Sequence, residues 1–283
     1  MMKLHSVNFH HIDACNMTCK YCFRREQTGK FLTQEQKLEV ITKLAEHFEK
    51  ITFVGGEPLL DKDLLPMILH AKQQGMTTMV VTNGLLLDDQ FLSSAQNYLD
   101  WIGISIDSLD EDTNKKIGRS TNKGFIPNRD FYQNLLVKIK QYGFKTKINT
   151  VVSKLNLQEN IKDFVQEVNP LRWKVFQVLK IEETNGTNFS QFEIEDMEFS
   201  SYLQHSDIKQ LVPENNEAML DSYYMVDSLG QFFSNTNNRL IKSHSILITE
   251  VLDAIKSLGI DLDKFLERGG KYQWDTLTNN VNV

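Results

Sequence analysis

The sequence predicts an α/β fold, a partial (β/α)6 barrel with a C-terminal extension that closes the barrel. Two observations predict it: strand-like and helix-like segments alternate along the chain, and six such units occur. This alternation is typical of parallel strands joined by right-handed crossovers, and six units are too few for a complete eight-fold barrel. The expected strands lie at residues 4–10, 51–54, 78–82, 101–106, 145–152 and 172–178.

The helices expected between these strands carry apolar residues on one face. Thr33 and Gln36 form a capping-box pattern where the first of them begins. The apolar face of that helix carries Leu38, Ile41, Ala45 and Phe48. Further helices are expected at residues 64–71, 88–98, 130–142 and 157–167.

The alternating pattern stops near residue 180. We therefore expect residues 1–180 to form the barrel core. Residues 181–283, where polar segments alternate with short helices, are expected to form an extension and a substrate-covering tail of the same domain.

The charge and the hydropathy pattern exclude some classes of partner. The 283 residues include 37 acidic and 31 basic side chains, for a net charge of −6. A general field of this sign argues against broad binding to nucleic acid or to anionic membranes. No apolar run approaches the roughly 18 residues of a bilayer span, and no apolar signal region precedes the first strand. We expect a cytoplasmic protein without a membrane partner.

All three cysteines lie within one short segment, as Cys15, Cys19 and Cys22. An odd number cannot all pair, so a secreted disulfide scaffold is excluded and a reducing compartment is expected. The C-x3-C-x2-C spacing follows the first strand, where loops of a parallel barrel build active sites. Four thiolates would fill every iron position of a [4Fe-4S] cluster, so three would leave one iron open to a ligand.

Two other interpretations of the cysteines stay open at this point. A structural zinc ion needs four ligands, and His10 or His11 could supply the fourth, although the spacing is unusual. The three thiols could also be unrelated to any metal.

Polar or glycine-rich segments follow the next three strands. Gly55 and Gly56 precede Glu57 and Pro58, and two glycines let backbone approach a ligand closely. Asn83 opens an Asn-Gly pair that could be a simple turn. Ser105 and Asp107 end the fourth strand, and either could cap the next helix.

Together, the cysteine spacing, the aromatic Tyr21 before the last cysteine and the Gly-Gly-Glu-Pro string resemble radical S-adenosylmethionine (SAM) enzymes. The resemblance implies that the open iron of a [4Fe-4S] cluster binds SAM, and that one electron cleaves SAM to a 5′-deoxyadenosyl radical. It implies that residues 55–58 support the methionine amino group. It also implies ribose and carboxylate contacts from Asn83, Ser105 and Arg119.

Longer strings between residues 6 and 274 resemble the viperin family, above all RWKVFQ at 172–177 and RGGKY at 268–272. The membrane-anchoring helix of animal viperins is absent, so a prokaryotic type is expected. The resemblance implies that a nucleoside triphosphate, CTP or UTP favoured, becomes its 3′-deoxy-3′,4′-didehydro analogue, an antiviral chain terminator. The implied steps are hydrogen abstraction at ribose C4′, loss of the 3′-hydroxyl as water, and addition of one electron and one proton. An electron donor of flavodoxin or ferredoxin type is implied.

Basic residues at the ends of the expected strands suit a triphosphate. Lys147 and Asn149 share one face of a strand, and so do Arg172 and Lys174. With Lys50, such inward cations would be costly unless an anion neutralised them. The alternative is that they are solvated charges at strand edges.

Three further assignments follow from the resemblance. Asn8 is expected to contact the substrate ribose or phosphates. Tyr223 is expected to donate a hydrogen atom or a proton late in the reaction, unless it is a packed core tyrosine. Residues 268–274 are expected to order over the nucleotide and exclude water.

Two other functions remain possible from the sequence. One is a different radical SAM enzyme that modifies a peptide or activates a partner protein. The other is a non-catalytic module that binds a nucleotide or zinc.

Overall fold

The computed structural model describes residues 3–23, 31–187, 189–204 and 208–271. They contain a ten-stranded sheet with the strand order β10-β9-β8-β1-β2-β3-β4-β5-β6-β7. The strands are β1 (Leu4–Ile12), β2 (Phe48–Gly55), β3 (Thr77–Thr82), β4 (Trp101–Ser105), β5 (Lys145–Val152), β6 (Arg172–Gln177), β7 (Leu211–Glu214), β8 (Met225–Val226), β9 (Gln231–Thr236) and β10 (Arg239–Ser245).

The five helices that the sequence predicts are present, and the structure adds others. The α-helices are α1 (Gln34–His47), α2 (Leu64–Gln73), α3 (Asp89–Ala95), α4 (Glu111–Ile117), α5 (Arg129–Gln141), α6 (Lys162–Val168), α7 (Asp196–Leu203), α8 (Asn216–Met219), α9 (Val251–Lys256) and α10 (Leu262–Glu267). The predicted five are α1, α2, α3, α5 and α6. Two short 3₁₀ helices are η1 (Pro58–Leu60) and η2 (Phe189–Gln191).

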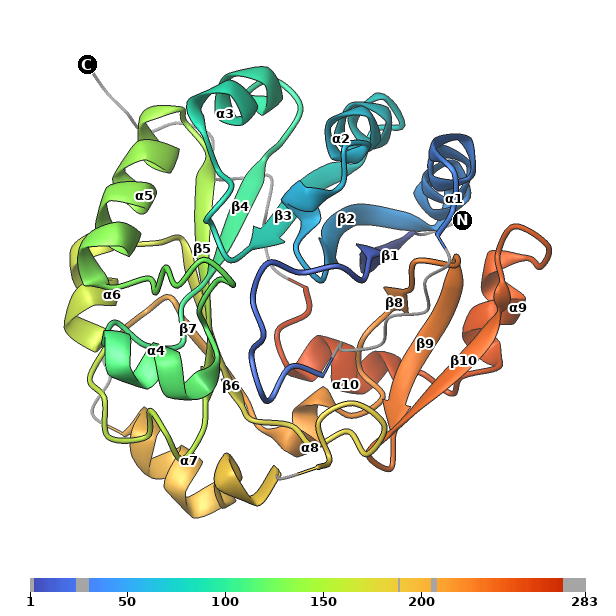
Figure 1. Cartoon of the computed structure of the whole chain (residues 1–283). Helices are drawn as coiled ribbons and strands as arrows, with labels where there is room; N and C mark the ends of the chain where they lie inside the picture. Colours follow the sequence, from blue (N-terminus) through green and yellow to red (C-terminus); the bar gives the residue numbers. More distant parts are fainter. Residues whose placement is uncertain (1–2, 24–30, 188, 205–207, 272–283) are drawn as a thin grey trace.

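Strands β1 to β6 are parallel neighbours, which confirms the six predicted strands. Figure 1 shows these strands curving around a central space, with α1, α2, α3, α5 and α6 on the outside. The alternation of side chains divides each strand between the two faces. In β5, Ile148 is fully buried among the core apolar residues, whereas Lys147 and Asn149 line a cavity inside the curve of the sheet.

Some predicted boundaries are wrong. The capping box on Thr33 and Gln36 is present, but α1 ends at His47, and Phe48 has an extended backbone that starts β2. The helix expected from residue 157 begins only at Lys162. Helix α4, which the sequence analysis did not predict, is capped by Asp110, so the suggestion that Ser105 or Asp107 caps it is also wrong.

The extension beyond residue 180 adds strands to both edges of the sheet, where the sequence predicted only irregular segments and short helices. Strand β7 pairs in parallel with β6, and β8 pairs in parallel with β1. Strands β9 and β10 continue from β8 as antiparallel neighbours. Strands from both sides of residue 180 thus share one sheet, and the place of a boundary between core and extension stays a prediction.

The partial barrel is open between its edge strands. β7 and β10 lie at opposite ends of the strand order, and no ladder among the described residues joins them. The part of the prediction in which the extension closes the barrel is therefore not shown. Within the same ranges, no helix has the length and apolar character that a bilayer crossing requires.

Candidate active site

The inside of the curved sheet holds a cavity of about 380 Å³. It brings together nearly all of the residues that the sequence singled out. Those that line it are Cys15, Cys19, Cys22, Gly55, Gly56, Glu57, Asn83, Ser105, Arg119, Asn8, Lys50, Lys147, Asn149, Lys174 and Tyr223. Arg172 is not among the lining residues, but its Nη2 donates a hydrogen bond of 2.7 Å to the carbonyl of Gly269, which does line the cavity.

The Gly-Gly-Glu-Pro segment docks directly on the backbone that leads into the cysteine loop. The amide of Gly56 donates to the carbonyl of Ile12 at 2.7 Å, and the amide of Glu57 donates to the carbonyl of Ala14 at 2.8 Å. A Cβ atom on Gly55 would lie 2.2 Å from the Ile12 oxygen, and one on Gly56 would lie 2.1 Å from the Ala14 oxygen. The glycines therefore allow a close approach between two protein segments.

The other side of the cysteine loop rests on the end of α4. The amide of Lys20 donates to the carbonyl of Ile117 at 2.8 Å, and the amide of Thr18 donates to the carbonyl of Gly118 at 3.3 Å. Gly118 has a φ of 90°, and a Cβ there would lie 2.5 Å from the Thr18 oxygen. Backbone contacts thus hold the loop from both sides, and its thiols need not contribute to that support.

The three thiols fit an iron–sulfur cluster. None is in a disulfide, and all three face the same cavity. Burial raises the pKa of Cys19 to about 12 and also raises that of Cys15, so these groups become thiolates only when a metal stabilises the charge. Three thiolates on one loop would hold three corners of a [4Fe-4S] cluster and leave the fourth iron for another ligand.

The alternative zinc site lacks its histidine ligand in this arrangement. Nδ1 of His11 lies 2.8 Å from an Asp61 oxygen, and the His10 ring packs edge-on against Phe233. Throughout the described ranges, no three His, Cys, Asp or Glu side chains converge on a single ion.

The Glu57 carboxylate braces the neighbouring loop. Its Oε1 accepts a hydrogen bond of 2.6 Å from the Thr82 hydroxyl, and its Oε2 accepts one of 2.9 Å from the Asn83 amide. The Asn83 side chain in turn donates to Oδ1 of Asn16, between the first two cysteines, at 2.7 Å. Burial raises the pKa of Glu57, although these donors oppose the shift. The loops after β1, β2 and β3 are thus joined into one polar assembly.

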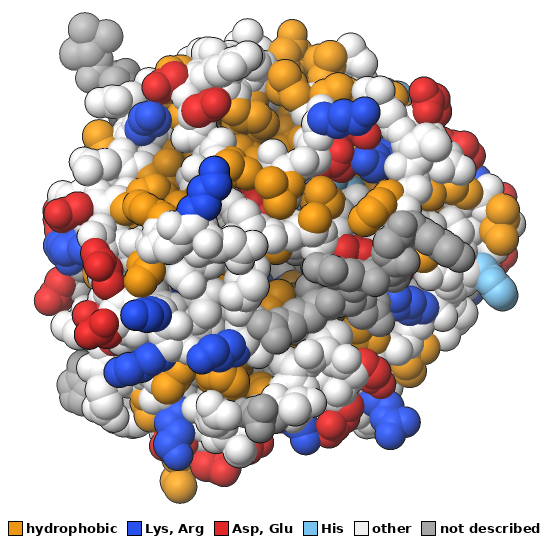
Figure 2. Space-filling model, viewed as in Figure 1, with side chains coloured by type: hydrophobic (Ala, Val, Ile, Leu, Met, Phe, Trp, Pro, Cys, Tyr) orange, Lys and Arg blue, Asp and Glu red, His pale blue; other side chains and the backbone are white. Residues whose placement is uncertain are grey.

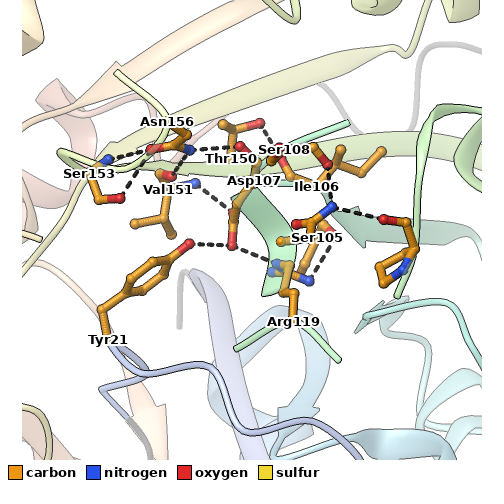
Figure 3. A network of polar contacts seen from close by, with 12 residues as sticks. Tyr21, Ser105, Ile106, Asp107, Ser108, Arg119, Thr150, Val151, Ser153 and Asn156 are labelled. Carbon is orange, nitrogen blue, oxygen red and sulfur yellow. Dashed lines mark hydrogen bonds and ion pairs between the residues drawn. The ribbon is translucent and has the colours of Figure 1, made fainter. Parts of the chain in front are cut away.

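Arg119 and Ser105 meet beside the cysteine loop (Figure 3). Nη1 of Arg119 donates to the Ser105 carbonyl at 3.1 Å, and Nε donates to Oδ2 of Asp107 at 2.7 Å. The Tyr21 hydroxyl donates to the same Asp107 oxygen at 2.7 Å. The sequence suggested only a helix cap at Asp107 and did not predict its place in this network.

The opposite part of the cavity is rich in buried cations. Their positions follow from the sheet register, because Lys147 pairs with Arg172 and Asn149 pairs with Lys174 on adjacent strands. Lys50 and Lys174 are 2% and 5% exposed, and Lys50 lies 5.7 Å from the centroid of the Trp101 ring. The interpretation of these cations as solvated strand-edge charges is therefore wrong.

One carboxylate partly compensates these cations. Glu214, at the end of β7, is fully buried and forms ion pairs with Lys174 and with Arg268. It also accepts a hydrogen bond from the Tyr223 hydroxyl, which lies 3.2 Å from the Lys174 Nζ. The Arg268 guanidinium lies 3.5 Å from the centroid of the Tyr223 ring. From the sequence, Arg268 was placed only in the tail expected to cover the nucleotide, and Glu214 was not assigned a role.

Burial perturbs the ionisation of these groups strongly. It lowers the pKa of Lys174 to about 7 and, together with Lys174, Lys50 and Arg172, lowers that of Lys147 well below its usual range. Burial also raises the pKa of Tyr223 well above its usual value, so its phenol keeps its proton at neutral pH. For Glu214, Lys174 and Arg268 outweigh burial and lower the pKa. The cavity therefore favours a polyanionic ligand, which would stabilise the charged lysines.

The predicted tail is only partly visible. Arg268, Gly269 and Gly270 line the cavity. Residues 272–274 lie outside the described residues, so the expectation that the whole stretch orders over a nucleotide stays a prediction.

Comparisons with known proteins establish the class. The Radical SAM superfamily matches residues 9–168. The solved structure of Streptococcus suis SuiB bound to S-adenosylmethionine covers 96% of this chain and 69% of its own, with a TM-score of 0.65 and 15% identity. Native anSMEcpe with bound AdoMet covers 93% and 82%, with a TM-score of 0.66 and 13% identity. The protein has a radical SAM fold, and its cofactors are a [4Fe-4S] cluster and SAM.

More similar relatives define the family. A protein of Flammeovirga pacifica named S-adenosylmethionine-dependent nucleotide dehydratase is 46% identical over 95% of this chain and 96% of its own length. One of the same name from Lacinutrix mariniflava is 47% identical over 98% of this chain, which spans 60% of that relative's length. The Danio rerio protein S-adenosylmethionine-dependent nucleotide dehydratase RSAD2 is 37% identical over 95% of this chain. The chain belongs to this viperin-like family of radical SAM enzymes.

The docking of Gly56 generates a first prediction. Gly56→Ala would place a methyl group against the Ala14 carbonyl and displace the cysteine loop, so the reconstituted protein should hold less than about half the iron and sulfide of the wild type. Iron and sulfide assays on anaerobic protein measure this. Gly75→Asn is the control, because Gly75 has nothing within 4 Å of a Cβ and asparagine tolerates its φ of 79°. Equal iron in Gly56→Ala would contradict the prediction.

The lowered pKa of Lys174 generates a second prediction. An anion favours the protonated lysine, so at pH 8 the binding of inorganic tripolyphosphate should take up protons, and affinity should fall as pH rises above about 7. Calorimetry in two buffers of different ionisation enthalpy measures the uptake. Lys174→Gln should reduce it, and identical heats in both buffers for the wild type would refute the expectation.

Proposed function

We propose that the protein converts a nucleoside triphosphate, with CTP or UTP favoured, into its 3′-deoxy-3′,4′-didehydro analogue, a chain terminator in antiviral defence. One observation carries the proposal: a set of buried cations shares a single cavity with the three cysteines. The names of the relatives, which describe nucleotide dehydratases, agree with it.

The cations select the class of substrate. A triphosphate is a polyanion that can accept hydrogen bonds from several lysines and arginines at once. The cations proposed to bind it are Lys50, Lys147, Arg172, Lys174 and Arg268. The face of the molecule in Figure 2 carries Lys and Arg side chains among Asp and Glu side chains. We therefore attribute the selection of an anionic substrate to the cavity and not to this surface. Glu214 compensates only part of the charge of these cations, and a bound polyanion would offset the cost of removing them from water.

The cysteine end of the cavity is proposed to bind the cofactors. Cys15, Cys19 and Cys22 hold the cluster, and the backbone of residues 55–57 supports the methionine amino group of SAM. When bound, the cluster and SAM supply the radical that removes a hydrogen atom from the substrate. Further contacts to the ribose and carboxylate of SAM are assigned to Asn83, Ser105 and Arg119.

The sugar of the substrate is proposed to lie between the two ends. Asn8 and Asn149 line this part of the cavity, and Oδ1 of Asn149 is buried without a hydrogen-bond partner among the described residues. A ribose hydroxyl would satisfy it. Tyr223 is proposed to donate a hydrogen atom or a proton late in the reaction, because its phenol stays protonated and lies against Lys174, which can replace the proton.

The reaction also sets requirements for an electron donor and for the cellular compartment. A one-electron donor of flavodoxin or ferredoxin type is proposed. After hydrogen abstraction and loss of water, the substrate radical still needs one electron and one proton to become the product. The three thiols, none of which is in a disulfide, and the oxygen-sensitive cluster that they would hold favour the reducing cytoplasm.

The test is anaerobic incubation of the reconstituted enzyme with SAM, a reductant and each nucleoside triphosphate in turn. We expect 5′-deoxyadenosine, and a nucleotide lighter by one water, only with a suitable triphosphate. Cys19→Ala should abolish both products because the cluster loses a ligand. Production of 5′-deoxyadenosine at the same rate without any nucleotide would instead favour a peptide-modifying or activating enzyme.

Tyr223→Phe tests the proposed donor. The phenyl ring keeps the packing under Arg268 but lacks the hydroxyl, so formation of the dehydrated nucleotide should fall at least about tenfold while 5′-deoxyadenosine still forms. Chromatography of both products measures the ratio. Tyr224→Phe is the matched control, and an unchanged ratio in Tyr223→Phe would rule out the donor role.

A further inference from the structure

The Asp107 carboxylate accepts hydrogen bonds from three separate parts of the chain (Figure 3). Its Oδ2 accepts from the Tyr21 hydroxyl and from Nε of Arg119, both at 2.7 Å. Its Oδ1 accepts from the amide of Val151, on β5, at 2.8 Å. The side chain of Asn156 donates to the Asp107 carbonyl at 2.6 Å and so fixes its backbone. With 2% exposure, Asp107 makes these contacts away from water.

Arg119 is oriented by two of its nitrogens. Asp107 holds Nε, and the Ser105 carbonyl accepts from Nη1 at 3.1 Å. Because a guanidinium is planar, two such contacts define the plane of the group. Burial lowers the pKa of Arg119, but Asp107 together with Cys19, Tyr132 and Tyr21 outweighs burial, and the pKa is raised. The oriented cation lines the cavity next to the cysteines.

Tyr21 links this arrangement to the cluster-binding loop, since it lies between Cys19 and Cys22. Its hydroxyl and Nε of Arg119 share a single oxygen of Asp107, so the loop and the arginine are positioned against the same atom. The side chain of Asn185 donates to the Tyr21 carbonyl at 2.9 Å and holds the tyrosine from its other side.

We propose that Asp107 is a positioning residue for SAM: it fixes Arg119 for the SAM carboxylate and, through Tyr21, sets that arginine relative to the cluster. This inference rests on the proposed role of Arg119 in binding the carboxylate. Asparagine cannot replace Asp107, because its single carbonyl oxygen cannot serve both the two side-chain donors and the Val151 amide.

The test compares two ligands on reconstituted protein without nucleotide. SAM carries the carboxylate, whereas 5′-methylthioadenosine carries the adenosine without it. Asp107→Asn should weaken SAM binding about tenfold or more, as expected for the loss of charge-assisted hydrogen bonds, and leave 5′-methylthioadenosine within about twofold. It should also change the electron paramagnetic resonance spectrum of the reduced cluster with SAM. Asp110→Asn is the matched control, because asparagine preserves the cap of α4.

Two results would overturn the inference. One is unchanged SAM affinity in an Asp107→Asn protein with normal iron content. The other is an equal loss for both ligands, which would mean that Asp107 contacts the adenosine or supports the fold generally.

Tyr21→Phe provides a second variant in case Asp107→Asn does not fold. It removes one donor from Oδ2 and should weaken SAM binding about two- to fivefold, again without affecting 5′-methylthioadenosine. Unchanged SAM affinity in this variant would count against the inference. These measurements need no turnover, so failure of every triphosphate to give product would refute the proposed function and leave this result standing.

Discussion

The concentration of buried cations inside the sheet is the constraint on which the rest of the site depends. Lys147 and Arg172 are neighbours in register, and Lys174 follows on the same strand face. Arg268, which directly follows α10, adds a further cation. Glu214 forms ion pairs with Lys174 and Arg268 and so offsets part of the positive charge. Without an anion, burial and repulsion from neighbouring cations lower the pKa of Lys147 and of Lys174 and so favour the neutral lysines. A bound anion would favour the charged lysines instead.

The cysteine loop is supported by main-chain hydrogen bonds on two sides. The amides of Gly56 and Glu57 donate to residues 12–14, which lead into the loop, and the loop's own amides donate to the end of α4. The contacts depend on the absence of side-chain atoms at Gly55, Gly56 and Gly118. The resemblance assigned the glycine segment to the cofactor, and the structure adds a second task, which is to support the loop.

The sequence predicted the parts of the fold that have strong periodic signals. Strands β1 to β6 and their helices alternate regularly, and the pleat places Lys147 and Asn149 on the inner face. Strands β7 to β10 escaped prediction because their signals are weak: β8 has two residues and β7 contains Pro213. The pair Asn237 and Asn238, both with positive φ, connects β9 to β10 and is a signal from which this hairpin could be predicted.

Within the site, the sequence identified the cysteines by their spacing. It identified most of the cations because lysine and arginine are unusual on the inner faces of strands. Asp107 could not be found in this way. Its partners Tyr21, Arg119 and Val151 come from distant parts of the sequence, and only the folded sheet brings them together. Glu214 was missed for the same reason, because its importance lies in the cations it neutralises.

The central place of β1 has a consequence for how the chain matures. Strand β1 ends at Ile12 and β8 begins at Met225, yet the two are neighbours in the sheet, and the amide of Asn8 donates to the carbonyl of Tyr224 at 2.8 Å. During translation, β1 therefore lacks its partner on one edge until β8 has been synthesised. Such non-local pairing slows folding and exposes intermediates to aggregation, so the nascent enzyme should depend on chaperones more than its size alone suggests.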